Sequence, residues 1–327
     1  MAPVTLTGRP HKVFRVRPRP RNLERLRCPS RMSEPAPCPS LRLLHPVLVL
    51  LASSVVWGLT WIPLKYFAGF GLQGVNVTLV GHGSVGLLSL AWLAHRWRGW
   101  WGARRPMLLL ATFGGLANLA FATAIVSGDV VRVMVLFYLL PAWGVLGGWL
   151  LLGERVDALR KLTVAAALSG AFLILGGVRI LAERPSLADV LAVVSGLALA
   201  LNNVLFRKLA GVPVPDKVAA MFAGCLLLAL PLTLLGVQPI PVGVAASIWW
   251  QLAGFGLVWL LLATAGTQWG VAHMEAGKSS VLIIMELLTA VASAAVINGV
   301  RLRPVEMLGG SLIVVAAFIE ARRPAEA

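Results

Sequence analysis

The sequence predicts an all-α integral membrane protein with ten transmembrane helices, arranged as two inverted repeats of five helices each. Three observations support this prediction: the apolar composition, the length of the apolar runs and an internal repeat. Of the 327 residues, 58% are hydrophobic and only 13% are charged. Soluble domains carry roughly 25% charged residues, so the composition favours a membrane protein.

Ten near-continuous apolar runs divide most of the chain. Each is close to the length of about 20 residues that a helix needs to cross a bilayer. Helices also satisfy their own backbone hydrogen bonds in lipid, and the runs lack the short alternating segments of a β-barrel. The runs cover about 46–66, 75–94, 107–127, 130–152, 160–178, 187–206, 218–236, 249–269, 280–299 and 304–320.

Residues 1–44 precede the first run and are predicted to form a basic, disordered tail rich in Pro and Arg. Residues 1–31 hold nine Lys and Arg residues against a single acid, Glu24, and such a composition cannot build a packed core. Three interpretations remain open: a cytoplasmic arm that touches anionic lipid, a targeting segment, or an untranslated stretch. We favour the third, because Met32 is a plausible start shortly before the first span.

The net charge of +16 does not indicate nucleic-acid binding, because the positive charge gathers in the tail and beside the apolar runs. With the N-terminus inside, ten spans place more Lys and Arg on the inner side than on the outer side. This distribution obeys the positive-inside rule. It predicts a multi-pass protein of the cytoplasmic (inner) membrane with both termini in the cytoplasm.

An internal repeat appears when the sequence is shifted by 146 residues. Asp129 then falls on Glu275, Arg132 on Lys278, Gly153 on Gly299 and Arg155 on Arg301. One copy contains five spans, an odd number, so the second copy must enter the membrane from the opposite side. Inverted repeats of this kind typically enclose a transport site near the bilayer midplane.

Several motifs resemble those of a known family. Span 1 contains Trp57-Gly58-Leu59-Thr60-Trp61-Ile62-Pro63-Leu64-Lys65, and span 4 ends in Leu150-Leu151-Leu152-Gly153-Glu154-Arg155. These stretches resemble EamA-type transporters of the drug/metabolite transporter (DMT) superfamily. The resemblance covers about 45–322 and implies two EamA repeats, at 45–180 and 186–322. It also implies export or exchange of small metabolites such as amino acids.

The second repeat departs from the family pattern at two places. Glu286 matches the glutamate of a Glu-Pro pair, but Leu287 replaces the proline, and Gly299-Val300-Arg301 replaces Gly-Glu-Arg. These departures make the local kink and helix cap of the second repeat uncertain predictions. They leave the predicted overall fold unchanged.

Glu286 is the leading candidate for a substrate-binding or proton-carrying residue. A carboxylate within a membrane-spanning segment costs roughly 2.5–3.5 kcal/mol on insertion scales, so it should face protein or a water-filled cavity. The alternative role is a structural partner for a polar group on a neighbouring helix. His82, in the middle of span 2, could titrate near neutral pH or bond to a neighbouring helix. Lys65 ends span 1 and could bind substrate or extend to the interface.

Further candidates for the cavity wall are aromatic or amide side chains inside the spans. Trp57 and Trp61 share one helical face, and packing is the competing role. Asn202 and Asn203 are adjacent and cannot share a face, so one is expected at the cavity and the other between helices. Interhelical hydrogen bonds are the alternative role for all the amides. The remaining candidates are Tyr138, Asn118 and Gln268.

No motif in the sequence indicates an enzyme, a cofactor or a metal site. The phosphate-binding pattern G-x-x-x-x-G-K-[ST] and metal-ligand spacings do not occur. We therefore expect a secondary transporter that exports a small organic metabolite, such as an amino acid, by alternating access. Coupling to protons and uncoupled exchange remain open, as does the oligomeric state. A non-transporting membrane scaffold or sensor, or a membrane-embedded lipid enzyme, is the alternative.

Overall fold

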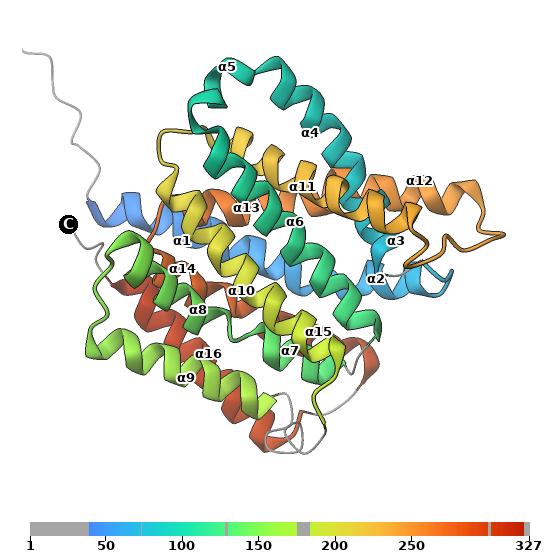
Figure 1. Cartoon of the computed structure of the whole chain (residues 1–327). Helices are drawn as coiled ribbons and strands as arrows, with labels where there is room; N and C mark the ends of the chain where they lie inside the picture. Colours follow the sequence, from blue (N-terminus) through green and yellow to red (C-terminus); the bar gives the residue numbers. More distant parts are fainter. Residues whose placement is uncertain (1–38, 73, 128–129, 175–183, 300–301, 324–327) are drawn as a thin grey trace, which may run out of the picture. The chain divides into compact units, whose positions relative to one another are not determined.

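The computed structural model describes residues 39–72, 74–127, 130–174, 184–299 and 302–323, and all the regular elements in these residues are helical (Figure 1). The all-α prediction is therefore confirmed for the described part of the chain. Residues 1–38, which contain most of the predicted tail, lie outside it, so the interpretations of the tail remain predictions.

Long helices alternate with short helical segments along the chain. The first part contains α1 (Pro39–Gly58), α2 (Trp61–Ala68), α3 (Val75–Val77), η1 (Thr78–His82), α4 (Gly83–His95), α5 (Trp97–Trp100), η2 (Trp101–Ala103), α6 (Arg104–Ser127), α7 (Val130–Phe137), α8 (Leu140–Gly147), η3 (Gly148–Leu152) and α9 (Ala158–Ile174). The second part contains α10 (Leu187–Lys208), α11 (Val214–Leu234), α12 (Ala246–Phe255), η5 (Gly256–Leu260), α13 (Leu261–Ala272), α14 (Ala276–Ile283), α15 (Met285–Asn298) and α16 (Pro304–Arg322).

Eight helical stretches among the described residues are long and apolar enough to cross a membrane. They confirm eight of the ten predicted runs as helical. The other two runs contain α7, α8 and η3, and α9, which are shorter. The count of ten spans therefore remains a prediction. The eight stretches are His45–Ala68, Val75–His95, Trp97–Ile125, Leu187–Lys208, Val214–Leu234, Ala246–Ala272, Ala276–Ile297 and Pro304–Arg322.

Three helices break inside the bundle. The chain turns between α1 and α2 at Leu59–Thr60, and between α7 and α8 at Tyr138–Leu139. These breaks precede Pro63 and Pro141, because proline removes a backbone donor and clashes with the preceding turn. The third break, at Ile284 between α14 and α15, has no proline. A kink is thus present near Glu286 even though residue 287 is leucine.

The helix that contains Glu286 also ends in a glycine cap. Gly153 ends η3 with a φ of +73°, and Gly299 ends α15 with a φ of +65°. This left-handed backbone favours glycine because any Cβ would crowd the chain. Both glycines, 146 residues apart, therefore close their helices in the same way.

Several helix pairs approach closely through small residues. A Cβ on Gly170 of α9 would lie 2.5 Å from the carbonyl oxygen of Gly309 of α16, and the reverse substitution would meet the same distance. Figure 1 shows these two helices side by side. A Cβ on Gly224 of α11 would lie 1.9 Å from the carbonyl oxygen of Ala111 on α6. Small residues let membrane helices pack backbone to backbone.

The extensive contacts follow a regular pattern. Helix α6 packs on α10 and α11, α1 packs on α13, and α4 packs on α11. Two further pairs are α8 with α14 and α9 with α16. This arrangement brings segments from the first and second halves of the chain together throughout the bundle.

Candidate substrate cavity

A cavity of about 610 Å³ lies among the helices. Its walls come from α1, α2, α3, η1, α6, α7, α10, α11, α12, η5, α13, α14 and α15. Its volume is in the range of sites that hold small organic molecules. The cavity is predominantly apolar, with a limited set of polar side chains.

Nine of the ten residues predicted from the sequence line this single cavity. They are Trp57, Trp61, Lys65, His82, Asn118, Tyr138, Asn203, Gln268 and Glu286. Their placement shows that residues scattered over more than two hundred positions converge. Whether they bind substrate remains a prediction.

Asn202 is the predicted residue that does not line the cavity. It is fully buried, and its Nδ2 lies 3.9 Å from the sulfur of Met221 on α11. Its neighbour Asn203 reaches the cavity instead. The structure thus places Asn203 at the cavity and Asn202 between helices, and the role of either residue in binding remains a prediction.

Glu286 and Tyr138 meet at two of the helix breaks. Tyr138 occupies the turn between α7 and α8, and Glu286 lies in the first turn of α15, just after the break at Ile284. Their side chains are hydrogen-bonded to each other. A phenolic donor lowers the cost of holding a carboxylate among apolar walls. The backbone of Glu286 also packs against Gly58 of α1, where an added Cβ would lie 2.6 Å from the Glu286 carbonyl oxygen.

Aromatic rings form much of the cavity wall. The ring centroids of Phe121 and Phe137 are 4.7 Å apart, and those of Phe137 and Tyr138 are 5.3 Å apart. The indole of Trp61 donates to the hydroxyl oxygen of Ser293 at 2.9 Å. Such rings offer an apolar surface that suits an aliphatic or aromatic group.

The other predicted residues lie at different depths. Lys65 is exposed on α2, near the end of the cavity formed by Ala68, Leu72 and Gly74. His82 is buried at the end of η1, with its ring centroid 6.0 Å from that of Phe222.

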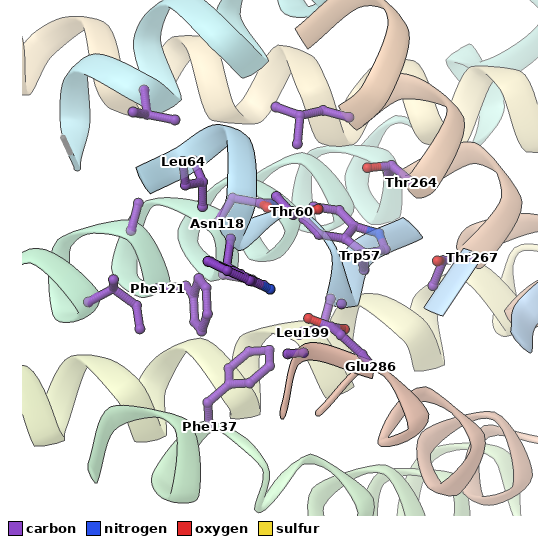
Figure 2. Close-up of a pocket in the computed structure, with 18 of the residues that line it drawn as sticks. Trp57, Thr60, Leu64, Asn118, Phe121, Phe137, Leu199, Thr264, Thr267 and Glu286 are labelled. Carbon is purple, nitrogen blue, oxygen red and sulfur yellow. The ribbon is translucent and has the colours of Figure 1, made fainter. Parts of the chain in front are cut away.

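The inner end of the cavity contains polar residues that the sequence reasoning missed. Thr264 and Thr267 lie on the same face of α13 as Gln268, and all three line the cavity. Figure 2 shows both threonines on one side of the cavity and Phe121 and Phe137 on the opposite side. Threonine is common in membrane helices, so the residue type gave no signal. Its spacing from Gln268 by three and four residues could have indicated a shared face.

The cavity occupies only one end of the bundle. On α1 the first residue that lines the cavity is Ser54. Along α7 and the turn that follows it, the last such residue is Tyr138, and no residue of α8 lines the cavity. On the paired segments α14 and α15, the lining begins at Ile283, the last residue of α14. The remainder of α14 is buried in the helix packing.

The opposite end of these helices contains a network of charged residues. Arg160 of α9 is only 1% exposed and pairs with Glu275 at the start of α14. Its guanidinium also lies 3.8 Å from Glu154 and 3.8 Å from Glu320. The two oxygens of Glu154 accept hydrogen bonds from the backbone of Ala276 and Gly277 at 2.8 and 3.2 Å, where the helix dipole favours a negative charge.

The outer shell of this network balances its charge. Arg207 lies 3.7 Å from Glu154, and Lys278 donates to the carbonyl oxygens of Ala321 and Arg323 at the end of α16. Arg323 donates to both oxygens of Asp157 at 2.9 and 3.0 Å. These bonds, with one from the Arg160 backbone, hold the pKa of Asp157 below its usual range. We call the eight residues Glu154, Asp157, Arg160, Arg207, Glu275, Lys278, Glu320 and Arg323 the charged network.

The family comparison agrees with this architecture. Residues 45–176 match the model of the EamA-like transporter family. This segment is an EamA domain. The resemblance predicted from the motifs of spans 1 and 4 is therefore confirmed over residues 45–176. This match and the long apolar helices support a multi-pass membrane protein. EamA is a transporter family, which agrees with the expectation that the chain is not an enzyme.

A comparison with solved structures extends the similarity beyond the EamA domain. A chain described as "Crystal structure of protein" matches 85% of this chain and 99% of its own length, with a TM-score of 0.70 and 18% identity. At this identity the similarity shows a common fold alone. No match was found among curated proteins.

Proposed function

We propose that this EamA protein is a secondary transporter that moves a small organic metabolite, such as an amino acid, across the membrane by alternating access. The observation that carries the proposal is that the cavity lies at only one end of the helix bundle. Its inner end holds a carboxylate at a helix break, and the charged network lies at the far end of the same helices. A transporter in one of its two access states needs one open and one closed end.

The helix pairing supports two inverted repeats within ten spans. If the spans are numbered along the chain, α1 with α13 is the pair 1–8, and α6 with α10 is the pair 3–6. Exchange of the two five-span copies converts one pair into the other. The pairs α4–α11, α8–α14 and α9–α16 each convert into themselves. This is the pattern expected when two copies of one bundle alternate in shape.

The charge distribution supports an inner-membrane protein with both termini in the cytoplasm. In that orientation the charged network lies on the cytoplasmic side, and the cavity extends toward the outer face through α2. The described conformation would then face outward. Export requires that the network open to admit the metabolite from the cytoplasm.

The experiment is transport into proteoliposomes across a panel of amino acids and related metabolites, with and without a pH gradient. Wild type is compared with Glu286→Gln, and Thr112→Val serves as a control because Thr112 is exposed and bonds only its own helix. We expect flux that follows the gradient in wild type and in the control, and that loses this dependence in Glu286→Gln.

The alternative outcomes separate the parts of the proposal. Flux that ignores both the gradient and the substitution would support an uncoupled transporter in which Glu286 is structural. Absence of flux for every panel member, from folded protein, would contradict the transport of these metabolites.

A further inference from the structure

Two amide side chains meet at the inner end of the cavity. Gln268 Nε2 of α13 donates to Asn203 Oδ1 of α10 at 3.2 Å, and both residues are almost fully buried. Within the described residues, Asn203 Nδ2 and Gln268 Oε1 have no hydrogen-bond partner. Rotating both amides by 180° would exchange the roles of the two residues. Either orientation leaves one free donor and one free acceptor.

Two hydroxyl groups lie on the same face of α13. The hydroxyls of Thr264 and Thr267 are buried and have no hydrogen-bond partner among the residues described by the structure. Several other threonines of this chain, in contrast, donate to the carbonyl oxygen four residues earlier in the sequence. They are Thr60, Thr78, Thr112, Thr123, Thr233 and Thr289.

The position of these four side chains explains the contrast. Asn203, Thr264, Thr267 and Gln268 all line the cavity, whereas an unpartnered polar atom in a packed interior would cost folding free energy. The four residues come from two helices, α10 and α13, and line one space. A ligand group, or water that the ligand displaces, would complete their hydrogen bonds.

We propose that Asn203, Thr264, Thr267 and Gln268 form a head-group subsite within the cavity. The subsite recognises a compact uncharged or zwitterionic group that both donates and accepts hydrogen bonds. The apolar body of the same ligand contacts the rings of the opposite wall, including Phe121 and Phe137. This inference rests on the proposed function in one respect, because it takes the cavity to be the substrate site.

The test measures binding to purified protein with matched probes that share a phenyl body. 3-Phenylpropanamide is compared with its N,N-dimethyl derivative, which lacks the amide donors. L-Phenylalanine is compared with 2-phenylethylamine, which lacks the carboxylate. We expect at least one complete head group to bind about tenfold tighter than its matched partner, as the loss of a buried hydrogen bond predicts. The pair that discriminates distinguishes an amide from a zwitterion.

The subsite is removed by the double variant Asn203→Leu with Gln268→Leu, checked for folding by thermal denaturation. In this variant the preference for the complete head group should fall below about threefold. If the double variant does not fold, Thr264→Val with Thr267→Val preserves the shape while removing both hydroxyls. Thr112→Val is the matched control, because its hydroxyl bonds its own helix outside the cavity.

Three results would overturn the subsite: equal binding within both probe pairs, a preference that survives in a folded variant, or no binding of any probe. The transport assay separates this failure from failure of the proposed function. Binding with the expected preference but without flux would support the subsite and contradict the proposed transport function. Flux with an unchanged head-group preference in the variant would support the proposed transport function and contradict the subsite.

Discussion

Arg160→Gln is the most informative perturbation of the charged network. The guanidinium of Arg160 lies within 4 Å of three carboxylates, those of Glu154, Glu275 and Glu320. Glutamine keeps much of the side-chain length but removes the charge. Glu275 and Glu320 are themselves buried, so water cannot replace the lost cation while the helices remain packed.

The expected cost is about 3–5 kcal/mol, the usual range for removing one member of a buried ion pair. We place it within this range rather than above it, because Arg323 remains 3.7 Å from Glu320 and Lys278 remains near both carboxylates. This loss of stability applies only while the charged network is closed, because opening the network would hydrate the carboxylates. The substitution should therefore raise the population of molecules in which the charged network is open, relative to the closed form, by a factor of about 10² to 4 × 10³.

The assay measures how rapidly an impermeant maleimide labels Ser280→Cys in a background without the native cysteines at 28, 38 and 225. Ser280 is fully buried, and an added Cβ on Gly144 of α8 would lie 1.8 Å from its oxygen. Labelling therefore requires separation of α8 and α14. We expect protection in the wild-type background and labelling at least about tenfold faster with Arg160→Gln.

Arg303→Gln is the matched control. Arg303 pairs with Glu306 at 2.7 Å but is 62% exposed, and an exposed pair contributes at most about 1 kcal/mol. It should leave labelling and thermal stability unchanged. Equal labelling and equal thermal stability of folded Arg160→Gln and wild type would refute the role of the charged network as the closed end.

Three further predictions concern packing, pH and the polar pair at the helix breaks. Gly256→Ala should lower the midpoint of thermal denaturation, because its Cβ would lie 1.8 Å from a carbonyl oxygen of η1, whereas Gly254→Ala meets nothing within 4 Å and should not. Asp157→Asn should lower the free energy of unfolding by at most about 1 kcal/mol at pH 7. The folded-state pKa of Asp157 is depressed, so its contribution to stability is present above about pH 4 and is lost as the pH falls further. Denaturation curves of the variant and the wild type should therefore converge in acid. Tyr138→Phe should cost about 1.5–3 kcal/mol by removing a hydrogen bond to a carboxylate, and clearly less in a Glu286→Gln background; an equal cost in both would contradict the pairing.

The sequence predicted the helical fold well because bilayer-spanning helices impose both length and composition on the chain. Eight runs correspond to long helices, and the breaks before Pro63 and Pro141 follow from the chemistry of proline. The break at Ile284 could not be predicted in the same way. It has no proline and depends on the surrounding helix packing.

The candidate site was predicted in part, because polar residues inside apolar runs stand out by type. That rule identified Glu286, Gln268 and Asn203 but not the threonines of α13, which do not stand out in a membrane helix. The charged network was not visible either. Arg160 bonds Glu275, 115 positions later in the chain, and lies near Glu320 of α16. In the sequence it is one of several positive charges beside the apolar runs, so its buried carboxylate partners could not be predicted.

The helix breaks at Tyr138 and Ile284 explain why the carboxylate of Glu286 can be accommodated inside the bundle. A continuous helix would present Glu286 to apolar neighbours, at a cost of roughly 2.5–3.5 kcal/mol. The break at Ile284 places it at a helix start, where unpaired backbone N–H groups favour negative charge, and the break at Tyr138 brings a phenolic donor to the same point.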